Sequence, residues 1–304
     1  MSDLIAIIVT YNRKHLLLRC LQAVARQTHP PSKIILVDNA STDGTVEALQ
    51  SAGWLNRADI CLIKLDLNLG GAGGFAAGWK HALELGANWL WMMDDDGYPA
   101  QDCLEKLLHA GMQYRLDAIS PVQADIDDAT KPAFPTFDAH GRAVTKLPAS
   151  PTHGENFVPF HANLFNGLLI QAETVRHLGL PRVELFIRGD EVEYTRRMLQ
   201  NGTRFGTLIN ATFYHPSDRS ERHRFFFGIG FAREAGNDFK NYYMFRNKGL
   251  AFRENGWLWM LPFDTARYVY YFLIHKNGDI HGLKLWSRAM LDGLFKRLGR
   301  HPDF

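Results

Sequence analysis

Three consecutive carboxylates follow the apolar segment Trp89–Met93. They are Asp94, Asp95 and Asp96. In an open α/β sheet, ligands bind at the carboxyl ends of the strands, where this triplet is expected to lie. Adjacent carboxylates repel one another unless a cation compensates their charge, and oxygen ligands of this kind suit Mg²⁺ or Mn²⁺. A solvated acidic turn leading to Gly97 would have the same composition, so the triplet alone leaves both interpretations open.

Two more polar segments follow apolar runs nearer the N-terminus. Thr10 to Arg13 ends the first run, and Asp38 to Gly44 ends the second. Turn and helix-cap chemistry accounts for part of residues 41–44. Asp38 is less easily explained in that way. It is the last residue of a buried apolar strand, and it is expected to lie beside the same ligand-binding cleft at the carboxyl ends of the strands.

Glycines are concentrated in the segment Asn68–Phe75, ahead of an expected helix. Glycine lets the backbone approach a ligand closely, and a helix N-terminus favours anions. The spacing fits neither the dinucleotide fingerprint nor the Walker loop. Taken alone, this segment is better explained as a flexible loop with tight packing between strand and helix.

Alternating strand and helix patterns place these polar segments at one edge of a sheet. Strands are expected at 4–9, 34–37, 60–65 and 89–93, and helices at 15–27, 43–52, 74–85 and 101–112. Alternation at this spacing predicts an α/β fold with a mostly parallel sheet flanked by helices.

The alternation ends near residue 120. Residues 121–160 are rich in Pro, Asp and Thr, which predicts loops and is compatible with a hairpin. A short strand is expected at 167–170 and a helix at 191–200. Helical, aromatic-rich sequence then runs to the C-terminus. We therefore expect a sheet domain at 1–225 and a helical extension at 226–304 packed on it.

The composition excludes several classes of protein. A hydrophobic fraction of 46% and a charged fraction of 22% exclude a disordered or fibrous chain. The net charge of +2 argues against a nucleic-acid binder. The charge is uneven, since residues 215–304 hold 15 Lys and Arg against 9 Asp and Glu. This pattern favours a cation site in the front part and an anionic partner for the rear part.

The three cysteines have no metal-like or redox-like spacing, which predicts reduced side chains in a cytosolic core. They are Cys20, Cys61 and Cys103. The chain shows no signal-peptide pattern, and its apolar runs are too short to span a bilayer. We expect a cytoplasmic location, with peripheral contact at the inner face of the plasma membrane as an option.

Four segments, in order along the chain, together resemble the signature motifs of family 2 glycosyltransferases. They are Thr-Tyr-Asn-Arg at 10–13, Val-Asp-Asn-Ala-Ser-Thr-Asp-Gly at 37–44, Asn-Leu-Gly-Gly at 68–71 and Met-Asp-Asp-Asp-Gly at 93–97. The resemblance implies an inverting enzyme with the GT-A fold. Such an enzyme uses a nucleotide-diphosphate sugar together with Mn²⁺ or Mg²⁺.

The resemblance also implies which residues bind the donor. Thr10 and Asp38 would line the nucleotide-base pocket, and Arg13 would help to hold the diphosphate. The glycine segment would contribute Asn68, Gly70 and Gly71.

Within the acidic triplet, the resemblance makes Asp96 the best metal ligand. Asp94 would lie near the ribose or the metal. Asp95 belongs to the same donor-binding motif but is expected to point away. In relatives, a histidine at the place of His215 completes the metal shell. The expected ligand set is therefore Asp94, Asp96 and His215.

The segment 186–194 resembles the family's Gly-Glu-Asp-Val-Asp motif, whose second acidic residue is the catalytic base. Matched by position, that base is Glu191, with Asp190 as its neighbour. The order of acid types is swapped here, which leaves Asp190 open as the base. Adjacent carboxylates raise one another's proton affinity, as suits a base near neutral pH. Acids at a helix N-terminus also complement the helix dipole, which is the structural alternative.

The rear part of the chain offers two further features. The basic loop 218–224 is expected either to close over the donor diphosphate or to be merely solvated. The aromatic residues and basic end of the tail would suit an interfacial helix on anionic lipid. Core packing onto the sheet domain, or onto a partner in a homo-oligomer, explains the aromatic residues equally well.

The donor sugar is indicated by the particular residues that occupy the motif positions. The glycine segment, residues 89–96 and Tyr242-Tyr243 before Arg246-Asn247 resemble bacterial galactofuranosyltransferases, which use UDP-galactofuranose. The expected acceptor is a hydroxyl of a glycan or lipid-linked glycan in the synthesis of a cell-surface polysaccharide. A rhamnosyltransferase using dTDP-rhamnose is the alternative.

Two other classes of protein are alternatives to a glycosyltransferase. A sugar-phosphate nucleotidyltransferase would need a glycine-rich, basic loop after the first strand, which residues 10–13 do not provide. A non-catalytic scaffold for glycan assembly would keep the fold and lose the chemistry. The filled acidic positions argue against it.

Overall fold

The computed structural model describes residues 3–134, 136–137, 143–144, 157–217, 221–225 and 230–303. The chain divides into two compact units. The sheet unit comprises Met1–Pro181 and Tyr194–Ser217, and the helical unit comprises Arg182–Glu193 and Asp218–Phe304. The boundary expected between residues 225 and 226 thus differs from the observed one. The second unit begins at 218 and also includes a segment from the middle of the chain.

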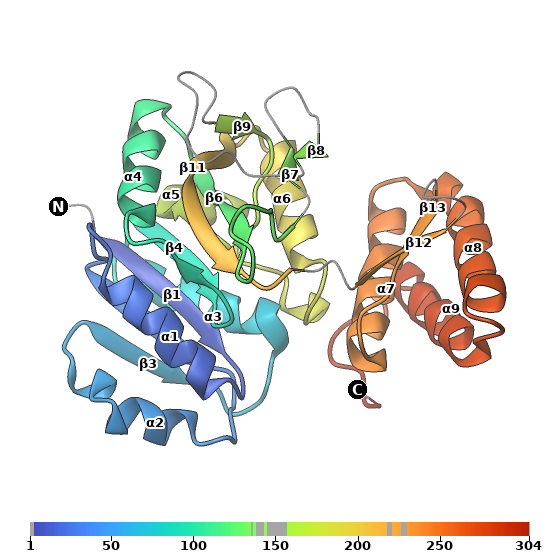
Figure 1. Ribbon diagram of the computed structural model, residues 1–304, viewed down its shortest axis with the longest axis horizontal. Helices are drawn as coiled ribbons and strands as arrows, with labels where there is room; N and C mark the ends of the chain where they lie inside the picture. The colour runs from blue at the N-terminus through green and yellow to red at the C-terminus, as the bar shows by residue number, and fades with distance from the viewer. Residues whose placement is uncertain are drawn as a thin grey trace. The chain divides into compact units, whose positions relative to one another are not determined.

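The sheet unit is built on a nine-stranded sheet with the order β3-β2-β1-β4-β10-β6-β11-β5, and β9 also pairs with β11 (Figure 1). Strands β3, β2, β1 and β4 are parallel, whereas β10 is antiparallel to both of its neighbours. This confirms the predicted α/β fold, with a mixed sheet. The strands are β1 (Leu4–Thr10), β2 (Lys33–Asp38), β3 (Ile60–Lys64), β4 (Trp89–Asp94), β5 (Tyr98–Pro99), β6 (Ala118–Asp125), β9 (Phe157–Pro159), β10 (Asn166–Gln171) and β11 (Phe205–His215).

The register of the parallel strands brings the predicted motifs to one level of the sheet. Thr10 lies opposite Asp38, and Val9 lies opposite Asp94. Because Thr10, Asp38 and Asp94 end their strands, the polar segments that follow leave the sheet at the same edge.

Helices cover both faces of this sheet. Side chains alternate along β1, so that Ala6 and Ile8 pack in one apolar cluster with α1 and α4, and Ile7 and Val9 pack in another with α3. The helices of the sheet unit are α1 (Lys14–Ala25), α2 (Thr45–Ser51), η1 (Trp54–Asn56), α3 (Gly70–Glu84), α4 (Cys103–Gln113), α5 (Ala172–Leu178) and most of α6 (Asp190–Gln200).

Several elements differ from those expected. Residues 118–125, expected mostly as loop, form the fully buried strand β6. Its polar residues break the apolar pattern that would predict a buried strand. Inside the protein these residues form hydrogen bonds, since the side-chain amide of Gln123 donates to Ser120 and to the Pro121 carbonyl. Helix α3 begins at Gly70 rather than at 74. The hairpin compatible with 121–160 is present as β7 (Thr136–Phe137) paired with β8 (Ala143–Val144).

The glycines of α3 allow this helix to lie close to the sheet. A Cβ atom on Gly78 would lie 2.5 Å from Ile7 Cγ2 and 3.1 Å from Val37 Cγ2. We expect Gly78→Ala to lower the free energy of unfolding by about 1–3 kcal/mol through overpacking. Gly111→Ala is the control, because in α4 the added methyl would make only ordinary contacts with Trp89 and Ile119. Denaturant unfolding should show Gly111→Ala to be neutral or stabilising, since alanine is the better helix former.

The helical unit has its own aromatic core. One cluster contains Tyr243, Tyr268, Tyr271 and Trp286. Phe186, from the segment Arg182–Glu193, lies in the same cluster. The predicted helical, aromatic-rich region is present, together with an unexpected hairpin. Its elements are η2 (Val183–Leu185), β12 (Arg222–Phe225), β13 (Gly230–Arg233), α7 (Asp238–Glu254), η5 (Leu258–Met260), α8 (Leu261–Tyr270), η6 (Tyr271–His275) and α9 (Ile280–Leu294).

Other aromatic side chains of this unit face solvent, among them Trp259 and Phe263. Within the described part of the chain, no helix is both long enough and apolar enough to cross a membrane.

Candidate active site

The acidic triplet lies where β4 ends and the chain turns. Asp95 is turned into the protein and is only 3% exposed. One of its oxygens accepts a hydrogen bond from the Thr10 hydroxyl at 2.6 Å, and the other accepts one from Arg13 at 3.1 Å. Burial raises the pKa of Asp95 to about 6, although Arg13 and Thr10 act in the opposite direction. Asp95 therefore ties the ends of β4 and β1 together, and the Thr10 hydroxyl is occupied by this contact.

Asp96 lies between two cationic or basic side chains. Its Oδ2 accepts a hydrogen bond from Arg13 at 2.8 Å, and its Oδ1 lies 3.1 Å from Nε2 of His215. Burial disfavours the charged carboxylate, but the contact with His215 and the charge of Arg13 outweigh burial and lower the pKa of Asp96 to about 2. Asp96 is thus a carboxylate at neutral pH.

His215 is the last residue of β11, and its ring is oriented from both sides. Nδ1 lies 2.6 Å from the Pro216 carbonyl oxygen, and the ring of Phe134 packs at a centroid distance of 4.8 Å. A carbonyl can only accept, so Nδ1 carries the hydrogen. In this orientation Nε2 faces Oδ1 of Asp96 at 3.1 Å. A carboxylate oxygen and an imidazole nitrogen in this arrangement are suitable ligands for Mn²⁺.

Two of the three predicted metal ligands are therefore brought together. Asp94 is the last residue of β4, whereas Asp96 lies in the turn that follows. Among the residues that the structure describes, no group of three or more His, Cys, Asp or Glu side chains forms a metal site. The expected set with Asp94 is not found there. A pair of protein ligands is still compatible with Mg²⁺ or Mn²⁺, because these ions commonly take their other ligands from substrate phosphates and water.

The second strand end and the glycine segment form one connected structure. Asp38 is buried, and its carboxylate accepts a hydrogen bond from the Ser41 backbone at 2.9 Å. The neighbouring Asn39 accepts from the Leu69 N–H and donates to the Gly70 carbonyl, both at 2.9 Å. Asn39 was not among the predicted site residues, although it is part of the Val-Asp-Asn motif. Its amide fixes the start of α3 beside the ends of β1 and β2.

Asn68 has a local role in the same turn. Its side-chain oxygen accepts a hydrogen bond from the Gly70 N–H at 2.8 Å. Gly70 has a φ of 71°, which glycine adopts readily. Gly71 follows in the first turn of α3. Donor binding by Asn68, Gly70 and Gly71 stays a prediction.

The candidate base residues open α6. Asp190 is buried, and Glu191 is half-buried with its Oε2 accepting a hydrogen bond from the Gly189 N–H at 3.1 Å. Both acids belong to the helical unit, whereas the predicted donor-binding residues described above belong to the sheet unit. Acids in this first turn also complement the helix dipole.

The basic loop expected at 218–224 is described only from Glu221 onward. Glu221 forms a bidentate ion pair with Arg188, with N–O distances of 2.6 and 2.9 Å, and lies 3.4 Å from Arg233. Arg222 begins strand β12. The described part of the loop is therefore structured, and residues 218–220 lie outside the described residues.

The fold and these strand-end motifs define a class of protein. Residues 5–165 match the model of glycosyl transferase family 2, and the chain belongs to this family. It is a glycosyltransferase with a GT-A-like α/β fold.

Within this family, the chain is similar to particular galactofuranosyltransferases. The chain is 35% identical to galactofuranosyltransferase GlfT1 of Mycolicibacterium smegmatis, over 98% of the chain and 97% of the relative. It is 36% identical to GlfT1 of Mycobacterium tuberculosis, over 100% of the chain and 97% of the relative. Both alignments include the helical unit.

Solved structures agree on the fold. S. aureus TarS, residues 1–349, in complex with UDP-GlcNAc matches with a TM-score of 0.60 and 14% identity, covering 98% of this chain and 82% of that TarS chain. GalNAc-T7 with UDP, GalNAc and Mn²⁺ matches with a TM-score of 0.58 and 16% identity, covering 84% of this chain and 51% of that protein.

Proposed function

We propose that the chain transfers galactofuranose from UDP-galactofuranose to a hydroxyl of a glycan or lipid-linked glycan in the synthesis of a bacterial cell-surface polysaccharide. The observation that carries this proposal is the identity of 35–36% with GlfT1 along nearly the whole of both chains. Two of the solved neighbours are complexes with UDP or a UDP-sugar, which supports a uridine nucleotide as the leaving group.

In the proposed reaction, the sheet unit holds the donor. Asp96 and His215 would hold Mn²⁺ or Mg²⁺, whose chemistry is to neutralise the charge of the departing diphosphate. Arg13, which lies 2.8 Å from Asp96, adds a fixed positive charge at the same place. Asp38, Asn39 and the turn before α3 are the candidates for contact with the nucleoside. Asp95 keeps Thr10 and Arg13 in position from inside the protein.

The helical unit would supply the base. Glu191 would take the proton from the acceptor hydroxyl while the oxygen attacks the anomeric carbon from the face opposite the leaving diphosphate. This single displacement inverts the configuration of the sugar, and no covalent sugar–enzyme intermediate forms. Asp190 is the alternative base, because the order of the two acid types differs from the family motif.

The proposal is tested by turnover with a panel of donors. The chain, Mn²⁺ and a lipid-linked glycan acceptor are incubated with UDP-galactofuranose, UDP-galactopyranose, UDP-GlcNAc or dTDP-rhamnose, and nucleotide release is followed. We expect release only with UDP-galactofuranose, and a product whose anomeric configuration by NMR is opposite to that of the donor. Turnover of dTDP-rhamnose would replace the proposed donor. Folded protein that turns over none of these donors would favour the non-catalytic scaffold.

We also propose peripheral contact with an anionic membrane through the exposed aromatic residues at η5 and α8. The side chains of Trp259 and Phe263 are 66% and 68% exposed, as suits insertion at a lipid interface. Replacing either one by serine should weaken sedimentation with phosphatidylglycerol vesicles about tenfold, the effect of losing one buried apolar side chain. Leu67→Ser is the control, because Leu67 is 65% exposed in the sheet unit. Equal binding by all variants would exclude this surface.

A further inference from the structure

The backbone immediately before the candidate base adopts an uncommon conformation. Phe186 has φ 65° and ψ −74°, and the Ile187 N–H donates to the Leu185 carbonyl at 2.9 Å. This is a γ-turn with positive φ, a strained conformation for a residue with a side chain. Arg188 and Gly189 follow with φ of 61° and 105°. Such a conformation persists only where the surrounding structure holds it.

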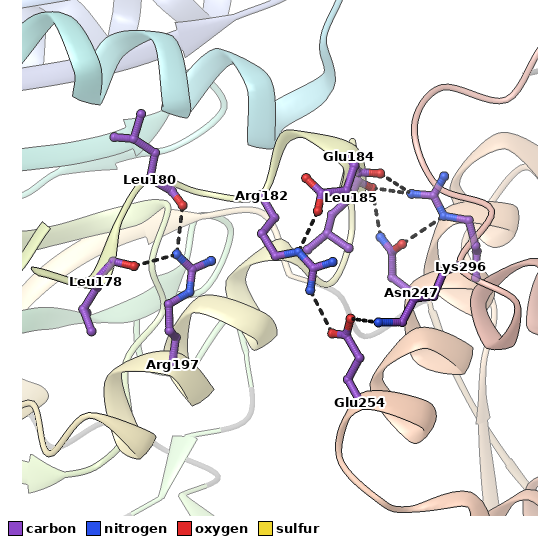
Figure 2. Close-up of polar contacts among 10 residues, drawn as sticks. Leu178, Leu180, Arg182, Glu184, Leu185, Arg197, Asn247, Glu254 and Lys296 are labelled. Atoms are coloured by element: carbon purple, nitrogen blue, oxygen red, sulfur yellow. Dashed lines mark hydrogen bonds and ion pairs between the residues drawn. The ribbon is translucent and has the colours of Figure 1, made fainter. Parts of the chain in front are cut away.

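The side-chain amide of Asn247 holds this segment. Its Nδ2 lies 3.0 Å from the carbonyl oxygen of Leu185, 2.9 Å from that of Ile187 and 2.6 Å from that of Arg188. Figure 2 shows Asn247 directed at the backbone of Leu185. The two N–H groups of this amide thus face three carbonyl oxygens within four residues and are shared among them. Asn247 lies on α7, far along the chain from the segment that it holds.

Arg246 sets the orientation of that amide. Its Nε donates to Oδ1 of Asn247 at 3.0 Å, which leaves only the NH₂ group of Asn247 to face the carbonyls. Its two terminal nitrogens donate to the carbonyls of Leu185, at 2.8 Å, and Gly299, at 2.5 Å. The guanidinium is buried among neutral acceptors and stacks on Tyr243, and burial lowers its pKa.

Other contacts leave this part of the helical unit little freedom to move. A Cβ atom on Gly293 of α9 would lie 1.8 Å from the Arg246 carbonyl oxygen, so α7 and α9 are in backbone contact at this point. The side chain of Phe186 is buried in the aromatic core against Tyr243. Arg182 pairs with Glu184 and Glu254 at the other end of the segment (Figure 2).

We propose that Asn247, oriented by Arg246, is a positioning residue that holds residues 185–189 in the strained conformation and thereby aims the acids at the start of α6. The proposal rests on the proposed function for its catalytic part, since Glu191 is the base there. Asn247 itself does not touch the reacting atoms. Removing its amide should leave donor binding intact and slow proton removal.

The first test measures the conformation without using activity. Hydrogen exchange of the peptide covering 184–192 is compared in wild type, Asn247→Ala and Asn247→Asp. The aspartate keeps the size of the side chain and the acceptor for Arg246, and it replaces only the donor group. The control is Asn241→Ala, which removes another buried amide of α7 that accepts from the Ala235 N–H. We expect at least tenfold faster exchange of this peptide in both Asn247 variants and no change in the control.

The second test is a double-mutant cycle with Glu191→Gln. We expect Asn247→Asp to lower kcat about 100-fold, as for a misplaced catalytic group, with the donor KM within about twofold of wild type. In the Glu191→Gln background the same change should have no further effect, because the group that Asn247 positions is already gone.

The outcomes separate this inference from the proposed function. Unchanged exchange at 184–192, or rate losses that multiply in the double variant, would overturn the positioning role while the enzyme assignment stands. A wild type without turnover would overturn the proposed function, whereas an unimpaired Glu191→Gln would show only that Glu191 is not the base. Either result would overturn the catalytic part of the inference, and exchange would still decide whether Asn247 holds the segment.

Discussion

Asp96→Ala is expected to abolish the stabilisation that UDP with Mn²⁺ gives the wild-type chain. A ligand at 100 times its dissociation constant adds about 2.7 kcal/mol to the free energy of unfolding. Asp96 is the carboxylate that faces both His215 and Arg13, and its low pKa keeps it charged at neutral pH. Its loss removes one of two protein ligands and leaves Arg13 without its closest partner. Transfer activity should fall at least about 1,000-fold, as when a group that stabilises developing charge is removed.

The matched control for this prediction is Asp102→Ala. Asp102 is a half-exposed acid of the same unit, paired with Lys106 at 2.7 Å and outside the triplet. It should keep the full nucleotide-dependent shift in melting temperature. Chelation of the metal should reduce wild type to the level of Asp96→Ala. A variant that still responds to UDP with Mn²⁺ as wild type does would show that the donor site lies elsewhere.

Much of the donor side of the site could be predicted from the sequence, because parallel strands of similar length end at one edge of the sheet. The positions of Thr10, Asp38 and Asp94 follow from the strands alone. Their side-chain directions do not. Asp95, which we expect to point away from the donor, is buried and accepts hydrogen bonds from Thr10 and Arg13. The alternation of side chains in a strand gives no guide to the direction of side chains in the turn that follows it.

The proximity of Asp96 and His215 is harder to predict from the sequence than the positions of the strand ends. The two residues lie far apart in the chain and meet because β11 runs along β6 and pairs with β5 just after the acidic turn. Strand β6 itself was missed, since Ser120, Gln123 and Asp125 make it look like a loop. A pattern that scores polar residues as exposed cannot anticipate a buried strand whose polar side chains bond to one another.

The membership of residues 182–193 in the helical unit could not be predicted. The contacts that place them there come from Arg246 and Asn247, more than fifty residues later, and they go to backbone carbonyls. Any sequence offers such acceptors, so the segment itself carries no pattern that marks it. Arg246-Asn247 is one of the sequence motifs in which the chain resembles galactofuranosyltransferases. The structure gives a physical reason for these two residue types, because both side chains donate hydrogen bonds to the backbone of this segment.

Glu191→Gln is expected to lower kcat by about 1,000-fold, within the range of 10² to 10⁴ that general base catalysis contributes. The affinity for UDP with Mn²⁺ should stay within about twofold of wild type. Asp190→Asn is the matched comparison, because it neutralises the adjacent acid in the same turn of α6. Steady-state rates at saturating donor and acceptor, with nucleotide affinity measured separately, check both expectations.

The burial of the two acids favours Glu191 as the proposed base. A base must reach a hydroxyl of an incoming acceptor, and Glu191 is half-buried whereas Asp190 is only 4% exposed. The Glu191 carboxylate is also held by the Gly189 N–H, so its position depends on the strained segment before it. A larger loss in Asp190→Asn than in Glu191→Gln would move the base to Asp190.

A loss confined to kcat would also have a structural meaning. The residues that we propose to bind the nucleotide belong to the sheet unit, whereas the acids at the start of α6 belong to the helical unit. If Glu191→Gln binds UDP normally and transfers slowly, donor binding and proton removal are assigned to different units of the chain. The strain at Phe186 then lies in the unit that performs the chemical step, where a fixed backbone is of most use.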